Sequence, residues 1–235
     1  MEPAAPLAAS SPDAPPSRAP GHATRLRISE IFHSIQGEAD AVGWPTVFVR
    51  LTGCPLRCTW CDTEYAFHGG QWRDIDEVLA EVARHRARHV CVTGGEPLAQ
   101  KRCLLLLARL CDAGHEVSLE TSGALDVAAV DPRVRKVVDL KAPGSGEVSR
   151  NLWSNMGHLL PHDQAKVVIA DRADYDWAVA RVAEHRLAER CQVLFSPVFG
   201  RLAPGQLAEW ILADRLQVRL QGQLHKALWG EERGR

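Results

Sequence analysis

The sequence predicts an α/β fold in which parallel strands form a partial, open, TIM-like barrel of the (β/α)6 type. Short runs of β-branched residues alternate with amphipathic helical patterns, which is typical of βαβ units and a parallel sheet. About six such units fit in the chain, fewer than the eight that close a barrel of roughly 250 residues. The 235 residues are 46% hydrophobic and 24% charged, so we expect one globular domain over residues 24–235.

The first 23 residues differ in composition from the rest of the chain. They are mostly Pro, Ala and Ser and contain almost no side chain that could be buried in a core. Because burial cannot offset the entropy of ordering such a segment, we expect residues 1–23 to form a disordered tail.

Six segments are predicted to be buried strands because β-branched and other apolar residues dominate them. They cover residues 46–53, 89–95, 116–123, 134–141, 165–170 and 191–197. Each is too short for a typical helix, and turn or helical patterns separate most of them. The order of these segments predicts a mostly parallel sheet.

Four helices are expected between or after these strands, at 74–89, 101–114, 172–189 and 205–215. The first has a clear start, since Asp74 is placed as N-cap and Glu77 lies at the capping-box spacing. Its predicted apolar face comprises Ile75, Val78, Leu79 and Val82. Gly114 is a suitable C-cap for the second helix.

Charge, hydropathy and cysteine content exclude several classes of protein. The net charge is -1, so neither nucleic acid nor an anionic membrane is an expected partner. No apolar stretch approaches the roughly 18 residues of a membrane span, and no signal-peptide pattern opens the chain, so we expect a cytoplasmic protein. The seven cysteines are an odd number, and three lie within eight residues, which favours reduced thiols over a disulfide framework.

Chemically distinctive residues cluster at the carboxyl ends of the first four expected strands, where parallel α/β sheets bind ligands. They are Cys54, the Gly-Gly-Glu segment at 94–96, the segment 120–122 and the segment 139–141. Because these strand ends meet at one edge of the sheet, we expect these residues to share one site.

Cys54, Cys58 and Cys61 form a C-x3-C-x2-C loop directly after the first of these strands. A structural zinc site normally uses four protein ligands, and the chain has no second close pair of cysteines. A 4Fe-4S cluster is the better fit, because three thiolates leave one iron without a protein ligand. A zinc site or a passive cluster stays open as an alternative at this point.

The loop resembles the radical S-adenosylmethionine (SAM) enzymes, since an aromatic residue, Trp60, precedes the last cysteine. That resemblance implies a barrel of the radical SAM type, with Cys54, Cys58 and Cys61 holding the cluster and SAM chelating the open iron. It also implies that the reduced cluster cleaves SAM to a 5'-deoxyadenosyl radical. The residues implied to seat SAM are Trp60, Asp62, Gly95, Glu96, Glu120 and Ser145.

The flanking sequence resembles the 7-carboxy-7-deazaguanine synthase family over nearly the whole chain after residue 25. The resemblance rests on the I-Q-G-E segment at 35–38, the cluster loop ending in C-D-T, and the Q-x-H-K segment at 223–226. Ala39 departs from the pattern, because the family commonly has Gly there. The implied reaction contracts the ring of 6-carboxy-5,6,7,8-tetrahydropterin with loss of ammonia, in queuosine biosynthesis.

The family resemblance implies a substrate site for this small anionic pterin. Arg50 suits a carboxylate because guanidinium pairs with it in bidentate geometry. Gln36 offers both a donor and an acceptor and Glu38 accepts, which complements an aminopyrimidinone edge. The expected substrate-binding residues are Ile35, Gln36, Gly37, Glu38, Arg50, Thr93 and His225.

The same resemblance implies that Thr63 binds a Mg2+ ion that also holds substrate oxygens. It implies an electron donor such as a flavodoxin, and a homodimer. Two other functions remain open in the sequence: a glycyl-radical-enzyme activase, which shares the cysteine spacing, and a non-catalytic zinc or iron-sulfur module.

Overall fold

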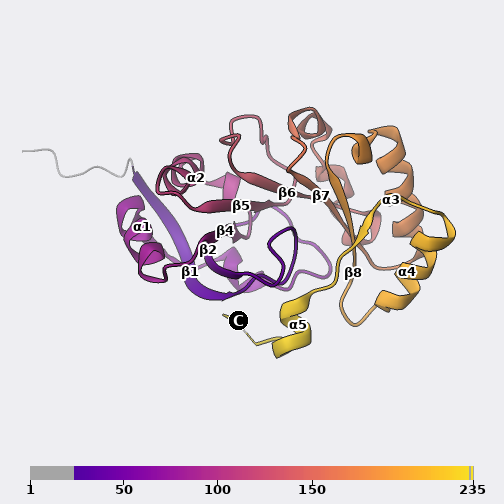
Figure 1. The fold of residues 1–235 in the computed structure, drawn as a ribbon, viewed down its shortest axis with the longest axis horizontal. Helices are drawn as coiled ribbons and strands as arrows, with labels where there is room; N and C mark the ends of the chain where they lie inside the picture. Colours follow the sequence, from indigo (N-terminus) through magenta and orange to yellow (C-terminus); the bar gives the residue numbers. More distant parts are fainter. Residues whose placement is uncertain (1–23, 233, 235) are drawn as a thin grey trace, which may run out of the picture.

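A computed structural model describes residues 24–232 and 234 of the chain. The tail predicted at 1–23 lies outside these described residues. One nine-stranded sheet organises them, in the order β3-β1-β2-β4-β5-β6-β7-β8-β9 (Figure 1). Within the described part of the chain the two outer strands do not pair with each other, so the barrel is open, as predicted.

The six predicted strands are present and run parallel to one another. They are β2 (Pro45–Leu51), β4 (His89–Gly94), β5 (Glu116–Thr121), β6 (Arg135–Leu140), β7 (Gln164–Ile169) and β8 (Gln192–Pro197). A short strand, β9 (Arg219–Leu220), adds to β8 in the same direction. Their shared direction brings the carboxyl ends to one edge of the sheet.

Two antiparallel strands extend the sheet beyond the prediction. β1 (Arg25–Ile35) pairs with β2, and β3 (Gln71–Asp74) pairs with the start of β1. Because β1 is antiparallel to β2, it ends beside the beginning of β2 and leads the I-Q-G-E segment under the barrel. The sheet is therefore mixed, with an antiparallel edge that the sequence interpretation lacked.

Helices cover the outer face of the sheet (Figure 1). They are α1 (Ile75–Arg84), α2 (Cys103–Asp112), α3 (Arg172–Glu184) and α4 (Pro204–Ala213). The short helix α5 (Leu224–Trp229) follows them in the chain and lies apart from this layer. Short 3-10 helices fill connections: η2 (Glu64–Phe67), η3 (Pro97–Ala99), η4 (Pro143–Ser145), η5 (Val148–Arg150), η6 (Trp153–His158) and η7 (Leu187–Glu189). Among the described residues no helix is long and apolar enough to cross a membrane.

The capping box predicted for α1 is confirmed. Asp74 accepts a hydrogen bond from the Asp76 amide at 3.0 Å, and Glu77 accepts one from the Asp74 amide at 3.1 Å. The helix ends at Arg84, earlier than predicted, because Arg86 has a φ of +52° that an α-helix cannot continue through. Gly114 ends α2 with a φ of +85°, as expected for a C-cap glycine.

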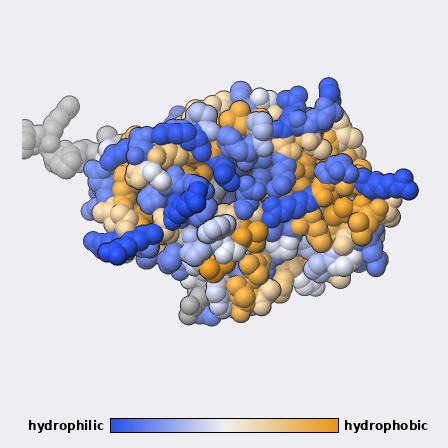
Figure 2. Space-filling model, in the orientation of Figure 1, coloured by the Kyte–Doolittle hydropathy of each residue, from blue (hydrophilic) through white to orange (hydrophobic). Residues whose placement is uncertain are grey.

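The core lies between the helices and the outer face of the sheet. Along β7, Ala165, Val167 and Ile169 pack into this core, whereas Lys166 and Val168 face the barrel interior. This alternation follows from the two-residue period of a strand. It leaves the interior free to carry polar side chains, and Figure 2 shows that the middle of the viewed face is largely hydrophilic.

Candidate functional site

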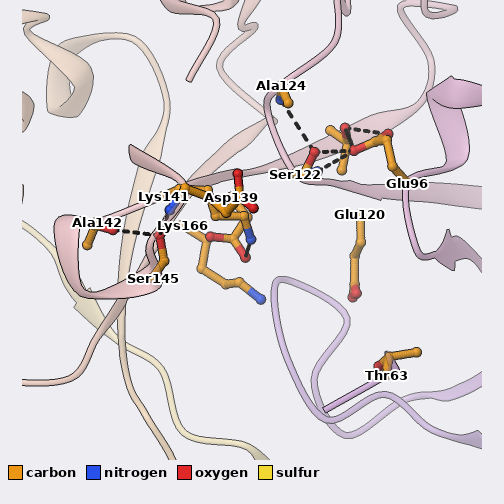
Figure 3. Close-up of polar contacts among 12 residues, drawn as sticks. Thr63, Glu96, Glu120, Ser122, Ala124, Asp139, Lys141, Ala142, Ser145 and Lys166 are labelled. Atoms are coloured by element: carbon orange, nitrogen blue, oxygen red, sulfur yellow. Dashed lines mark hydrogen bonds and ion pairs between the residues drawn. The ribbon is translucent and has the colours of Figure 1, made fainter. Parts of the chain in front are cut away.

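A cavity of about 710 Å³ occupies the interior and the carboxyl end of the barrel. The three cysteines of the predicted cluster loop line it, together with most of the other predicted site residues. Figure 3 shows Asp139, Lys141 and Lys166 on one wall, with Glu120 and Thr63 across the space from them. The predicted clustering at one edge of the sheet is therefore confirmed.

The cysteine loop leaves β2 at Gly53, whose φ of +99° is in the region that favours glycine. Backbone hydrogen bonds fix its course: the Gly53 amide donates to the Ala66 carbonyl at 2.8 Å, and the Thr59 amide donates to the Ser145 carbonyl at 3.0 Å. The Arg57 amide donates to Glu147 at 2.5 Å. The loop is thus held from both sides of the cavity.

Cys54, Cys58 and Cys61 are free thiols of intermediate exposure. Partial burial raises the pKa of each above its ordinary value, so the thiols hold their protons until a metal displaces them. Within the described residues, no three His, Cys, Asp or Glu side chains converge on one metal ion. A 4Fe-4S cube binds each thiolate to a different iron, so three cysteines on one loop suit such a cluster.

Gly94 and Gly95 bring the loop after β4 against the loop after β2. The Gly95 amide donates to the Leu51 carbonyl at 3.2 Å, and a Cβ on Gly95 would lie 2.3 Å from the Gly53 carbonyl oxygen. Only glycine fits such an approach, which exposes peptide groups to the cavity beside the cysteine loop. The predicted turn is therefore also a packing contact between two site loops.

Glu96 is predicted to seat SAM, and its carboxylate is hydrogen-bonded within the described chain. Its side chain is fully buried, and Figure 3 shows it directed toward Ser122. It accepts hydrogen bonds from the Leu98 amide at 2.9 Å, from the Thr121 hydroxyl at 2.9 Å and from the Ser122 amide at 2.7 Å. This carboxylate joins the loop after β4 to the end of β5, so we assign it a structural role.

Ser145 is also predicted to contact SAM, and its side chain is likewise hydrogen-bonded within the described chain. The side chain is fully buried and outside the cavity lining, because its hydroxyl donates to the Ala142 carbonyl at 2.6 Å and accepts from the Glu147 amide at 3.1 Å. Its own carbonyl accepts the Thr59 hydrogen bond described above. Ser145 therefore supports the cysteine loop through its backbone carbonyl.

Glu120 faces the cavity and links two predicted substrate residues. Gln36 donates to it from Nε2 at 3.4 Å, and the Thr93 hydroxyl donates at 3.3 Å. Both donors are almost fully buried, whereas Glu120 keeps partial exposure. These long contacts leave the three side chains able to turn toward a ligand.

Glu38 forms a buried ion pair with Lys166 across the bottom of the barrel. Lys166 Nζ lies 2.7 Å from Oε2 of Glu38, and Gln223 Nε2 donates to Oε1 at 2.8 Å. Burial alone would raise the pKa of Glu38, but the charge and hydrogen bond of Lys166 hold that pKa below its ordinary value. Glu38 is therefore an ionised acceptor.

Arg50 lies in the cavity wall with its Nε donating to Glu30 at 2.6 Å. Tyr65 donates its hydroxyl to the same carboxylate at 2.8 Å, and the guanidinium lies 5.8 Å from the centroid of the Phe32 ring. In the described part of the chain, Glu30 is the only hydrogen-bond acceptor found for Arg50, through Nε. Its terminal nitrogens suit a ligand carboxylate.

The C-terminal segment closes the cavity against the I-Q-G-E segment. The Leu224 amide donates to the Gly37 carbonyl at 3.0 Å, and His225 lies directly against Gly37. Lys226 Nζ lies 3.5 Å from a carboxylate oxygen of Asp62 and 4.9 Å from the Phe199 ring centroid. This segment thus joins the substrate residues to the cysteine loop.

Thr63 ends the cysteine loop and lines the cavity. Its hydroxyl donates to Asp62 Oδ1 at 2.8 Å, which places two oxygen atoms suited to a metal ion side by side. Ala39 has a φ of +60°, a conformation that favours glycine and explains why the family pattern has Gly at this position. Within the described chain, Ala39 adopts this conformation while remaining buried.

Several residues that line the cavity or contact its lining were not assigned a role from the sequence. Lys166 had a signal, because a lysine within the apolar run "AKVVIA" needs a partner when it is buried. Glu30 and Tyr65 had none, since their shared contact with Arg50 depends on how β1 and η2 meet. Trp60, Ile35 and Gly37 line the cavity as predicted.

Comparisons with known proteins agree with the motifs. Residues 48–142 match the family model described as Radical SAM superfamily. The chain is 48% identical over 210 residues to a 7-carboxy-7-deazaguanine synthase of Chlorobaculum tepidum, covering 88% of this chain and 96% of that one. It is 43% identical over 222 residues to the synthase of Koribacter versatilis, covering 88% and 98%. The crystal structure of QueE from Escherichia coli matches with a TM-score of 0.71 at 25% identity, covering 86% and 95%.

Proposed function

The chain belongs to the 7-carboxy-7-deazaguanine synthase family of radical SAM enzymes, and we propose that it converts 6-carboxy-5,6,7,8-tetrahydropterin to 7-carboxy-7-deazaguanine and ammonia. Loss of ammonia alone balances this equation, so the reaction needs no net oxidant. It makes the enzyme a carbon-nitrogen lyase of queuosine biosynthesis. The supporting observation is one cavity that joins the three-cysteine loop to a polar pocket suited to a small anionic pterin.

Cys54, Cys58 and Cys61 would hold a 4Fe-4S cluster, with one iron left for the amino and carboxylate groups of SAM. When bound, the reduced cluster and SAM supply the radical that abstracts hydrogen from the substrate. Peptide groups of Gly95 and the partly exposed Glu120 would contact SAM, together with Trp60 and Asp62 from the cysteine loop, since all four residues line the cavity. Glu96 and Ser145 support this site by holding its loops.

The substrate would lie between the I-Q-G-E segment and Arg50. The Arg50 guanidinium would bind the pterin carboxylate, since Glu30 already fixes its orientation through Nε. Glu38 and Gln36 would accept from and donate to the aminopyrimidinone edge, and Thr93 and His225 would complete the polar lining. Ile35 and Gly37 would contribute backbone and surface contacts.

Mg2+ is proposed at Thr63, with substrate oxygens and water completing its coordination. The ion prefers oxygen ligands and retains several waters, so one threonine hydroxyl is a sufficient protein ligand. The adjacent Asp62 carboxylate adds negative charge on the same side of the cavity. A cation here would orient the substrate carboxylate for the rearrangement.

The proposal includes an external electron donor such as a flavodoxin, because an oxidised cluster cannot start the reaction. A homodimer and a cytoplasmic location are carried over from the family resemblance. Neither alternative function is favoured, because relatives over nearly the full chain are synthases.

Ammonia release tests the proposal. Reconstituted enzyme with SAM, Mg2+ and a low-potential reductant should release one ammonia for each tetrahydropterin consumed. Consumption of SAM without ammonia would keep the radical SAM assignment and reject the substrate. The same incubation without the pterin is the control, because it should release none.

A further inference from the structure

Within the ion pair of Lys166 and Glu38, the Glu38 carboxylate can still accept hydrogen bonds from a ligand. Each oxygen of the Glu38 carboxylate accepts one protein hydrogen bond, at 2.7 Å from Lys166 and 2.8 Å from Gln223. A carboxylate has about four lone-pair sites, so one remains free on each oxygen. Two parallel acceptors of this kind match two neighbouring N–H donors on one edge of a heterocycle.

Lys166 is placed to keep that carboxylate ionised. Both side chains are only 13% exposed, and an isolated carboxylate at such depth would take up a proton. A protonated Glu38 would become a donor on one oxygen and could no longer accept two ligand hydrogen bonds. Lys166 therefore keeps Glu38 a hydrogen-bond acceptor on both carboxylate oxygens.

The fold also fixes where Lys166 can point. It lies in the middle of β7 opposite Asp139 of β6, and the strand period directs both side chains into the cavity. Figure 3 shows Lys166 beside Asp139 on this wall, with Glu120 across the cavity. These acids surround the ammonium group, but the 2.7 Å ion pair joins it to Glu38.

We infer that Lys166 is a positioning residue for substrate selection, holding Glu38 as a double acceptor that selects a 2-amino-4-oxopyrimidine edge. This inference rests on the proposed function and adds a residue to it. The N3–H and the 2-amino group of a pterin supply the two adjacent donors. A lumazine edge presents a carbonyl oxygen in place of the amino group. One oxygen of the Glu38 carboxylate would then lack a donor and would be repelled by that carbonyl oxygen.

The test compares 6-carboxytetrahydropterin with 6-carboxytetrahydrolumazine as ligands of the reconstituted enzyme. The unmodified enzyme should prefer the pterin by at least about 100-fold in binding, because a site built for a polar group rejects an analogue lacking it. Lys166→Met should raise the KM for the pterin roughly 10- to 100-fold, the range expected for hydrogen bonds to a charged group. Lys166→Met should also reduce the ratio of pterin affinity to lumazine affinity, while SAM binding stays within about two-fold, since the substitution alters only the part of the site that faces the pterin edge.

Four further variants separate positioning from general damage. Lys166→Arg keeps the charge and should recover most of the preference. Lys136→Met removes a second buried ion pair, 2.8 Å from Asp163 and outside the cavity, so it should lower stability but leave the preference intact. Lys166→Met alone leaves the buried Glu38 carboxylate without its ion-pair partner and could fail to fold. A comparison of Glu38→Gln with Glu38→Gln/Lys166→Met avoids this, because neither variant carries that carboxylate.

The double variant decides the result. If Lys166 acts through Glu38, adding Lys166→Met to Glu38→Gln leaves the KM and the preference unchanged. If the KM of the double variant instead rose by the product of the two single effects, the inference would be overturned. An unchanged preference for pterin over lumazine in Lys166→Met would also overturn it. If the unmodified enzyme fails to convert the pterin at all, the proposed function fails, and the inference fails with it.

Discussion

His225 lies against the backbone of Gly37, so closely that a Cβ on Gly37 would come 2.0 Å from His225 Nδ1. The glycine is required for this contact and not for its own backbone angles, because its φ is not in the left-handed region. The neighbouring Leu224 amide donates to the Gly37 carbonyl at 3.0 Å. This contact joins the two ends of the described chain around the candidate substrate site.

Gly37→Ala should therefore displace the C-terminal segment and weaken substrate binding. We expect the KM for the pterin to rise roughly 10- to 100-fold, the scale reached when a binding group moves by about 1 Å. Steady-state kinetics check this. Gly157→Ala is the matched control, since a Cβ there meets nothing within 4 Å. A normal KM in Gly37→Ala would show that the contact is dispensable.

Cys58→Ala should abolish both the visible absorbance of the cluster and the cleavage of SAM. The remaining two thiols cannot hold a cube that needs three protein ligands while SAM takes the fourth iron. Absorbance and iron content after anaerobic reconstitution measure the first effect. Cys111→Ala is the control, because that thiol lies in α2 away from the cavity and should leave the cluster intact. Cluster retention in Cys58→Ala would refute the ligand assignment.

Thr63→Ala should raise the Mg2+ concentration required for half-maximal activity by about ten-fold or more, since it deletes an oxygen ligand worth about 1.4 kcal/mol. The cluster absorbance should not change. Thr63→Ser retains the hydroxyl and should keep most of the response to Mg2+. An identical Mg2+ titration for Thr63→Ala and the unmodified enzyme would place the ion elsewhere.

Glu96→Gln should lower the free energy of unfolding by about 2 kcal/mol, because a neutral amide replaces a charged acceptor of several buried hydrogen bonds. Urea unfolding of the apoprotein measures this without the cluster. Glu209→Gln, an exposed change on α4, should stay within about 0.5 kcal/mol of the unmodified protein. Equal losses in both variants would contradict the structural role of Glu96.

Much of the fold could be predicted from local patterns. All six predicted strands lie where β-branched runs predicted them, and the Asp74 capping box marks the start of α1 as expected. β1 was missed, although its start, "RLRIS", alternates polar and apolar residues. Its antiparallel pairing with β2 depends on contacts across the sheet, which local periodicity does not encode.

The candidate site was predictable where a motif fixes the course of the backbone. It was less predictable where tertiary contacts determine the orientation of a side chain. The cysteine spacing and the Gly-Gly turn identified the cavity, and the family resemblance drawn from them is confirmed. Glu96 and Ser145 follow strands as predicted, yet their side chains turn into the fold and find partners there. A sequence motif places a residue in a loop, but tertiary hydrogen bonds decide which way it faces.

The most direct test of the proposed reaction is mass spectrometry of an anaerobic incubation with reconstituted enzyme, 6-carboxytetrahydropterin, Mg2+, a low-potential reductant and limiting SAM. The proposal predicts 7-carboxy-7-deazaguanine in excess over the SAM consumed, because hydrogen returns to regenerate SAM after each turnover. Accumulation of 5'-deoxyadenosine with unchanged pterin, in protein shown to hold the cluster, would contradict it.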